Sequence, residues 1–222
     1  MASLSRAVDR VTDCHCHLRS VEEIAPLVEA RHGVGFDTMN IVCGCTRRGR
    51  NSNPQAFAAK ATHPELFTVF AGLDHSAWWS RGQVRTPSLA DQVDRLVRFG
   101  ADGIKLLETK PTSRQALPIP IDDAYFEAFF ERVEECGLPL VWHVADPEEF
   151  WDPARTPAWA ATKGWGYDDS VVSKEALYAE VQNVLARHPA LKAVFAHFYF
   201  LSADLPRAGA FLDAHPSVLL DV

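Results

Sequence analysis

The sequence has no long apolar run, no block of like charge and no basic stripe. Its apolar segments are all shorter than the roughly 20 residues that a membrane-spanning helix needs. The first residues also lack the apolar core of a signal peptide. A net charge of −7 without a basic stripe argues against nucleic-acid binding. We therefore expect a cytoplasmic protein that has neither a membrane nor a nucleic acid as its partner.

Cysteine is scarce, and its spacing argues against a cysteine-rich zinc site. Four of the five cysteines form two Cys-x-Cys pairs, and none forms a Cys-x-x-Cys pair, which is the usual spacing around structural zinc. An odd number of cysteines, mostly in strand-like segments, fits buried reduced thiols better than disulfides.

Neither a flexible linker nor a shift in composition divides the chain. Apolar residues make up 47% and charged residues 23%, as in ordinary globular proteins, and 222 residues suffice for a substantial core. We therefore expect a single domain over residues 1–222.

Apolar periodicity predicts strands that alternate with helices from end to end. The predicted strands cover residues 8–17, 38–43, 67–73, 103–107, 139–144, 191–197 and 218–222. The helices are expected to begin at Ser20 (with Glu23 in a capping box), Asn53, Ser88, Asp122 or Asp123, and Ser173, with one more over residues 205–214. Strict alternation predicts a parallel sheet with helical crossovers. The loops that follow strands are much longer than those that precede them, which is the layout of a (β/α)-barrel enzyme.

The segment Asp13-Cys14-His15-Cys16-His17 is the most informative motif. It ends the first predicted strand, so His15 and His17 share one face, while Cys14 and Cys16 face the helices. Two imidazoles on one face can bind a single metal ion. A pair of solvent-facing histidines would give the same pattern, so this motif alone leaves both interpretations open.

Two further histidines lie at strand ends. His143 and His197 fall at the carboxyl ends of the fifth and sixth predicted strands, where they would meet His17 at one mouth of the barrel. A single histidine at a strand end is more often a core or hydrogen-bonding residue. Three strands that each deliver one histidine to the same mouth predict a metal site. A metal with an open position lowers the pKa of a bound water to about 7 and polarises a carbonyl.

These motifs together resemble the amidohydrolase superfamily. Its members carry Asp-x-His-x-His at the end of strand one and a histidine at the ends of strands five and six. The segments Gly100–Lys105 and Phe195–Phe198 are similar to its amidohydrolase-related branch, which includes hydrolases and non-oxidative decarboxylases. The resemblance implies a (β/α)8 TIM barrel with His15, His17 and His143 as ligands of zinc or manganese. His197 would then bind metal or contact the substrate and the reacting water.

The carboxyl end departs from that family. The family places a catalytic Asp at the end of strand eight, whereas this chain ends with Asp221-Val222 in what we predict as strand seven. Asp221 is therefore expected to lie one strand too early. We expect a barrel truncated after strand seven, with a complete seven-stranded barrel as the alternative. In that alternative, Asp146 or Asp221 is the candidate base.

Basic and aromatic residues near the mouth are candidates for substrate binding. Lys105 on strand four either bridges two metals after carboxylation, as in some family members, or binds a substrate carboxylate; we favour one metal. Arg81 is a second partner for a carboxylate. Trp151 belongs to the aromatic loops after strands three and five, which suit an apolar wall and a lid. The alternative is that these aromatic side chains only pack the loops onto the barrel.

The resemblance implies a metal-dependent hydrolase of C–N or C–O bonds with a small-molecule substrate, a carboxylate or an aromatic compound. The alternatives are a decarboxylase of an aromatic or unsaturated acid and a non-catalytic remnant without the strand-eight Asp. A metal-dependent deoxyribonuclease family shares the segment Asp13–Leu18, but its strand-four Glu is missing here. The polymerase-and-histidinol-phosphatase family continues with Ser-Asp-Gly, where this chain has Leu18–Ser20. A homo-oligomer is also expected.

Overall fold

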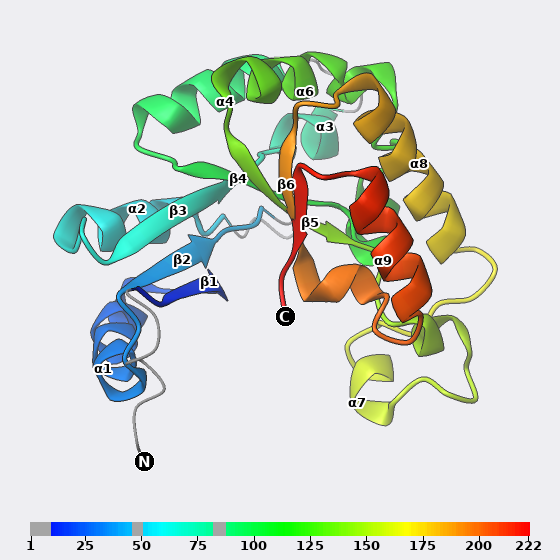
Figure 1. The fold of residues 1–222 in the computed structure, drawn as a ribbon, viewed down its shortest axis with the longest axis horizontal. Coiled ribbons are helices and arrows are strands. Elements are labelled where there is room, and N and C mark those ends of the chain that lie inside the picture. Colours follow the sequence, from blue (N-terminus) through cyan, green and yellow to red (C-terminus); the bar gives the residue numbers. More distant parts are fainter. Residues whose placement is uncertain (1–9, 46–50, 82–87) are drawn as a thin grey trace.

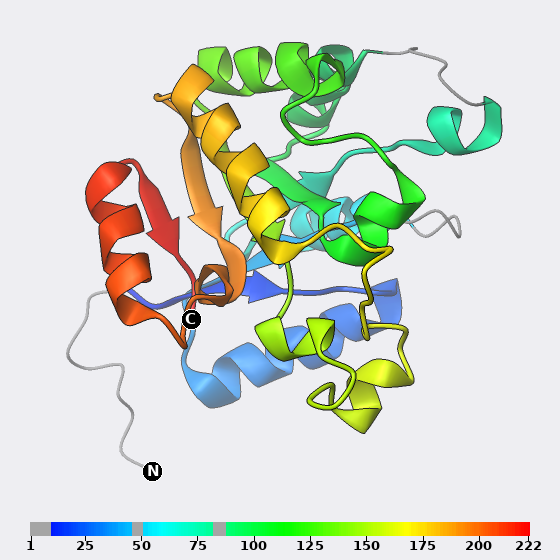
Figure 2. The same ribbon diagram turned by 90° about the vertical axis from the view of Figure 1, so that its right-hand side faces the viewer.

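Seven parallel strands form one curled sheet. The computed structural model describes residues 10–45, 51–81 and 88–222, without the side chain of Arg81. The strands pair in chain order, and helices cover the outside of the curl (Figures 1 and 2). The strands are β1 Thr12–Cys16, β2 Thr38–Val42, β3 Phe67–Gly72, β4 Gly103–Thr109, β5 Pro139–Val144, β6 Lys192–Phe195 and β7 Val218–Leu220. The predicted alternation and parallel pairing are therefore confirmed.

Long helices connect the strands, and short ones interrupt the loops at the mouth. The longer helices are α1 Ile24–Val34, α2 Asn53–Thr62, α4 Leu89–Arg98, α6 Ala124–Cys136, α8 Lys174–Arg187 and α9 Leu205–Ala214. The short ones are α3 Ser76–Arg81, α5 Pro111–Ala116 and α7 Ala158–Ala161, with 3-10 turns η2 Val21–Glu23, η3 Glu148–Trp151 and η4 Ala196–Phe200. Within the described ranges, none of the helices combines the length and apolarity that crossing a membrane requires.

Three predicted helix caps are confirmed. The Ser88 hydroxyl accepts a hydrogen bond from the backbone of Asp91, whose carboxylate accepts one from the backbone of Ser88. Asp123 and Ser173 accept equivalent bonds in the first turns of α6 and α8. These bonds satisfy amide groups that have no partner inside the helix.

Two other predicted caps are wrong. Ser20 makes no capping bond, and the carboxylate of Glu23 accepts instead from the backbone of Arg19 at 2.7 Å. Asn53 is the first residue of α2, and its amide group bonds to both backbone groups of Gly72, at 2.9 Å each. The side chain of Asn53, which the local pattern predicted as a helix cap, therefore bonds to Gly72 at the end of β3 instead.

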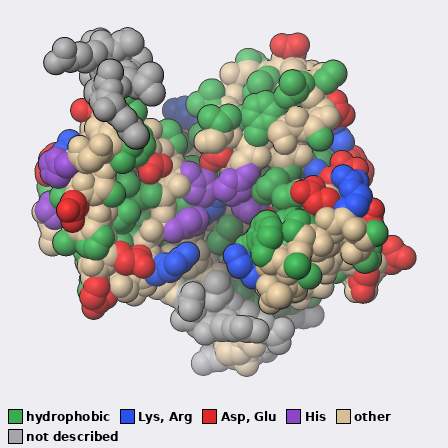
Figure 3. Space-filling model, turned by 90° about the horizontal axis from the view of Figure 1, so that it is seen from below, with side chains coloured by type: hydrophobic (Ala, Val, Ile, Leu, Met, Phe, Trp, Pro, Cys, Tyr) green, Lys and Arg blue, Asp and Glu red, His purple; other side chains and the backbone are tan. Residues whose placement is uncertain are grey.

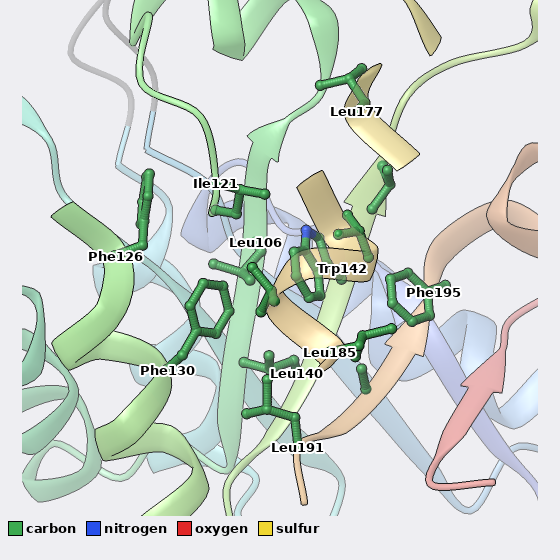
Figure 4. Packing of buried hydrophobic residues seen from close by; sticks show 14 of the residues in the cluster. Leu106, Ile121, Phe126, Phe130, Leu140, Trp142, Leu177, Leu185, Leu191 and Phe195 are labelled. Carbon is green, nitrogen blue, oxygen red and sulfur yellow. The ribbon is translucent and has the colours of Figure 1, made fainter. Parts of the chain in front are cut away.

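The largest core lies between the outer face of β4–β6 and helices α6 and α8 (Figure 4). Trp142 of β5 packs between Phe130 and Phe195, with ring centroids 5.6 and 5.4 Å away. Burying each such side chain stabilises the fold by about 1.5–3 kcal/mol. Because side chains alternate along a strand, anchoring Trp142 outward directs His143 toward the inside of the curl.

The two edges of the sheet are less well covered. β1 pairs with β2 alone and β7 with β6 alone in the described chain, and α1 contains no buried residue. The β1–β2 register is irregular between Asp13 and Cys16. The curl nevertheless brings the carboxyl ends of both edge strands together, so that side chains of β1 and of the residue after β7 meet at the mouth.

Candidate metal centre

Histidine side chains gather in a hollow on the face seen in Figure 3. The ring of His15 lies 5.2 Å from that of His17 and 4.9 Å from that of His197, between centroids. The ring of His197 lies 5.2 Å from that of His143. The expected convergence of the strand-end histidines is therefore observed, and it joins β1, β5 and the end of β6.

The two histidines of β1 are each oriented through one ring nitrogen. Nδ1 of His15 lies 2.6 Å from a carboxylate oxygen of Asp221, and Nδ1 of His17 lies 3.1 Å from the carbonyl oxygen of Val42. Both partners accept, so each Nδ1 carries the proton. The Nε2 nitrogen of each ring is then the unprotonated one, which is the form that binds metal.

The cysteines next to these histidines do not share this site. Cys16 is part of a hydrophobic cluster, and its thiol donates to the carbonyl of Asn40. Burial raises the pKa of Cys16 to about 12, so its thiol is protonated. Cys14 is exposed, contrary to the expectation that it faces helices, because β1 is an edge strand.

His143 is buried and contacts a saturated carboxylate. Its Nε2 lies 3.2 Å from Asp146, which also accepts from Lys110 at 2.6 and 2.8 Å and from the hydroxyl of Tyr167 at 2.5 Å. Burial raises the pKa of Asp146, but the hydrogen bond from His143 and the charge of Lys110 outweigh it and hold that pKa below its usual value. Asp146 is therefore ionised, and its oxygens are occupied by these three side chains.

His197 reaches the centre from a left-handed turn and not from a strand. The predicted sixth strand extended to His197, whereas β6 ends at Phe195 and residues 197–200 all have positive φ, between 48° and 58°. The backbone N–H of His197 donates to the carboxylate of Asp221. Within the described ranges, no hydrogen-bond partner faces the ring nitrogens of His197, which leaves them available to a ligand.

Desolvation favours the neutral form of three of the imidazoles. It lowers the pKa of the buried His143 to about 3 and, although both side chains are partly exposed, also lowers the pKa of His197 to about 4 and that of His17. Neutral imidazole is the form that ligates a metal or accepts a proton.

Lys105 points into the curl, which its position in β4 had left undecided. Its side chain is only 1% exposed, and its Nζ lies 3.4 Å from Nε2 of His15. Burial lowers the pKa of Lys105 to about 7. No carboxylate among the described residues is within hydrogen-bond distance of this amine, so it is a buried amine without an ion-pair partner.

Of the other predicted substrate contacts, the structure describes the side chain of Trp151. Trp151 donates to the carbonyl of Val172 at 3.2 Å and packs on Tyr167. Together with Phe200, it also lines a cavity of about 440 Å³. The side chain of Arg81 lies outside what the structure describes.

Asp221 follows the seventh strand, as predicted, and so lies one strand before the position of the family's Asp. Its side chain nevertheless reaches the histidine cluster, where it contacts both His15 and the backbone of His197. Donor atoms of His15, His197 and Asp221 all lie within 4.8 Å of one another. Imidazole and carboxylate are ligand types that zinc uses, so the donors present fit a divalent metal. The sequence contained one signal for this role: Asp221, like His143, lies at the carboxyl end of a strand.

Comparison with known proteins gives a family and a fold. A family model described as amidohydrolase matches residues 12–222, and no curated protein matches the chain. An uncharacterised TIM-barrel protein from Bordetella bronchiseptica matches with a TM-score of 0.63 at 13% identity, over 95% of this chain and 74% of its own. The 4-oxalomesaconate hydratase LigJ of Rhodopseudomonas palustris matches with a TM-score of 0.61 at 13% sequence identity, over 95% of this chain and 73% of LigJ. The 5-carboxyvanillate decarboxylase LigW of Sphingomonas paucimobilis matches with a TM-score of 0.55 at 14% sequence identity, over 96% of this chain and 76% of LigW. At these identities the likeness shows the TIM-barrel fold.

Proposed function

This chain belongs to the amidohydrolase family, and from this premise we propose that it is a metal-dependent hydrolase of C–N or C–O bonds in a small molecule. The observation that carries the proposal is the cluster of four imidazoles at the mouth, beside a buried lysine. When bound, a divalent metal polarises a carbonyl and lowers the pKa of a water molecule.

His15, His17 and His143 are the proposed ligands. Each has an acceptor on one ring nitrogen: a carboxylate for His15 and His143, and a backbone carbonyl for His17. Such acceptors fix the tautomer and leave the other nitrogen unprotonated, as is usual around metal-bound histidine. In this assignment Asp146 and Asp221 orient ligands. Zinc and manganese are the expected metals.

His197 is the proposed proton-transfer residue. Its ring stacks on His15 and meets His143 edge-on, and its nitrogens have no partner among the described residues. It is therefore placed to accept a proton from the attacking water and return it to the leaving group.

Lys105 is the proposed binding partner of a substrate carboxylate. A buried amine without an anionic partner is costly, and a carboxylate on the substrate would supply that partner. Trp151 and the loop around it would cover the substrate and exclude water. Arg81 remains a predicted contact.

Metal analysis of single variants tests the ligand assignment. About one metal per chain is expected in the parent, with large losses in His15→Ala, His17→Ala and His143→Ala and retention in His197→Ala. Loss in His197→Ala and Asp221→Asn with retention in His17→Ala and His143→Ala would replace this set by His15, His197 and Asp221. A parent protein that binds no metal after reconstitution would favour the non-catalytic remnant.

One observation favours decarboxylation as the second candidate. The carboxylates nearest the histidines, Asp146 and Asp221, are already hydrogen-bonded, which leaves no free carboxylate base beside the imidazoles in the described chain. Decarboxylation breaks the C–C bond to the carboxyl group, releases CO₂ and requires a proton donor to the carbon that remains, a role that the protonated amine of Lys105 could fill; it needs no activated water. Turnover of carboxylic acid substrates in ¹⁸O-labelled water separates the two reactions. Incorporation of ¹⁸O into the organic product supports hydrolysis, whereas release of CO₂ with no ¹⁸O in the organic product supports decarboxylation.

A further inference from the structure

The turn that carries His197 has a conformation that its residues rarely adopt. Four consecutive residues, His197 to Phe200, have φ values of 58°, 55°, 55° and 48°, and none is glycine. In the left-handed region the Cβ atom crowds the following carbonyl oxygen. Residues other than glycine therefore adopt this region rarely, and then as single residues and not in a run. Such a turn persists only where its surroundings hold it.

One side of the turn is held by the residue that follows β7. The carboxylate of Asp221 accepts from the backbone N–H of His197, and its backbone carbonyl accepts from that of Phe198 at 2.7 Å. These bonds fix the beginning of the turn relative to the sheet.

The other side is held by two side chains of α8. The hydroxyl of Tyr178 donates to the carbonyl of Tyr199 at 2.8 Å, and Nζ of Lys174 donates to the carbonyl of Phe200 at 3.0 Å. Tyr178 is buried and also packs on the ring of Tyr199, 4.6 Å between centroids. Both bonds reach carbonyls in the second half of the turn, which the bonds from Asp221 do not reach.

The position of this turn decides where two rings of the candidate site lie. The His197 ring stacks on His15 with an interplanar angle of 25°. The Phe200 ring lies 5.4 Å from both His143 and His197. A shift of the turn would therefore move the proton-transfer residue and one wall of the mouth together.

We propose that Tyr178 and Lys174 are positioning residues: by holding the left-handed turn from α8, they fix His197 and Phe200 against His15 and His143. The proposal depends on the proposed function only for the role of His197. It can be tested without substrate or metal, so that its failure is distinguishable from failure of the proposed function.

The test uses Tyr178→Phe and Lys174→Met, with NMR of the histidine and phenylalanine ring protons. The stacked rings shift one another's signals, so loosening the turn should move the His197 and Phe200 signals toward their values in unstructured peptides. Lys174→Arg should retain the parent signals. The matched control is Lys192→Met, because Lys192 approaches the carbonyl of Gly137 from the opposite end of β6. Unchanged His197 signals in folded Tyr178→Phe and Lys174→Met, or equal movement in Lys192→Met, would overturn the proposal.

A double-variant cycle with Phe200→Gly separates holding the turn from general packing. Glycine adopts a positive φ without strain, so the turn needs Lys174 less when residue 200 is glycine. Adding Lys174→Met should therefore move the His197 signals less in the Phe200→Gly protein than in the parent. An equal movement in both backgrounds would contradict the positioning role. Lys174 is partly exposed, so this arm remains usable if Tyr178→Phe does not fold.

Discussion

Replacing Lys110 by Met should destabilise the protein and weaken metal binding together. Nζ of Lys110 donates to both carboxylate oxygens of Asp146, at 2.6 and 2.8 Å. It also lies 4.6 Å from the centre of the Trp165 ring. The side chains of Lys110 and Asp146 are 15% and 4% exposed, so the substitution leaves a buried carboxylate without its cation. Removing one partner of a buried ion pair costs about 3–5 kcal/mol. Asp146 orients His143, and losing such a partner outright typically lowers metal affinity by about 10–100-fold, so Lys110→Met, which only weakens the hold on Asp146, should lower the affinity by no more than that.

The control is Lys60→Met, which removes the same side chain from a more exposed pair. Lys60 donates to both oxygens of Asp102 at 2.7 Å, but the two side chains are 25% and 34% exposed. Exposed pairs contribute about 0.2–1 kcal/mol. Urea unfolding gives the two free energies, and competition with a chelator gives the two metal affinities. Equal destabilisation by both substitutions, or parental metal affinity in folded Lys110→Met, would refute the reasoning.

Three further predictions concern the same site. Asp221→Asn removes the charge that orients His15 and should lower the free energy of unfolding by about 1.5–3 kcal/mol and the metal affinity by about 10–100-fold; an unchanged affinity would contradict its orienting role. Cys14→Ser should change neither stability nor metal content, whereas Cys16→Ser should lower the melting temperature but keep the metal, and loss of metal in either would argue against the alternation of faces. Removing the metal with a chelator should lower the free energy of unfolding by about 2.7 kcal/mol, relative to protein in a metal concentration of 100 times the Kd. Differential scanning calorimetry can measure this difference, and no change would argue against a metal site in the folded state.

The features that the sequence predicted correctly are those set by local periodicity. Alternation within β5 buries Trp142 and turns His143 inward, and parallel pairing places the carboxyl ends of the strands at one mouth. Helix caps such as Ser88 and Ser173 were also predictable, because their partners lie within three residues along the chain.

The features that it missed depend on contacts between distant segments. The turn at His197 contains no glycine, so its positive φ values leave no mark in the residue types. The contact between Asp221 and His15 could not be predicted, because strand counting does not show how strongly the sheet curls at its edges. The saturation of Asp146 by Lys110 and Tyr167 joins three separate segments. Neither periodicity nor motif spacing contains information on such contacts.

The most direct test of the central claim is an anomalous difference map at the zinc absorption edge, from crystals of this chain soaked in zinc. The account predicts one strong peak in bonding distance of His15, His17 and His143, with the ring of His197 beside it and unbound. A peak bonded to His197 and Asp221 and remote from His143, or no peak at the histidine cluster, would contradict the proposed metal centre.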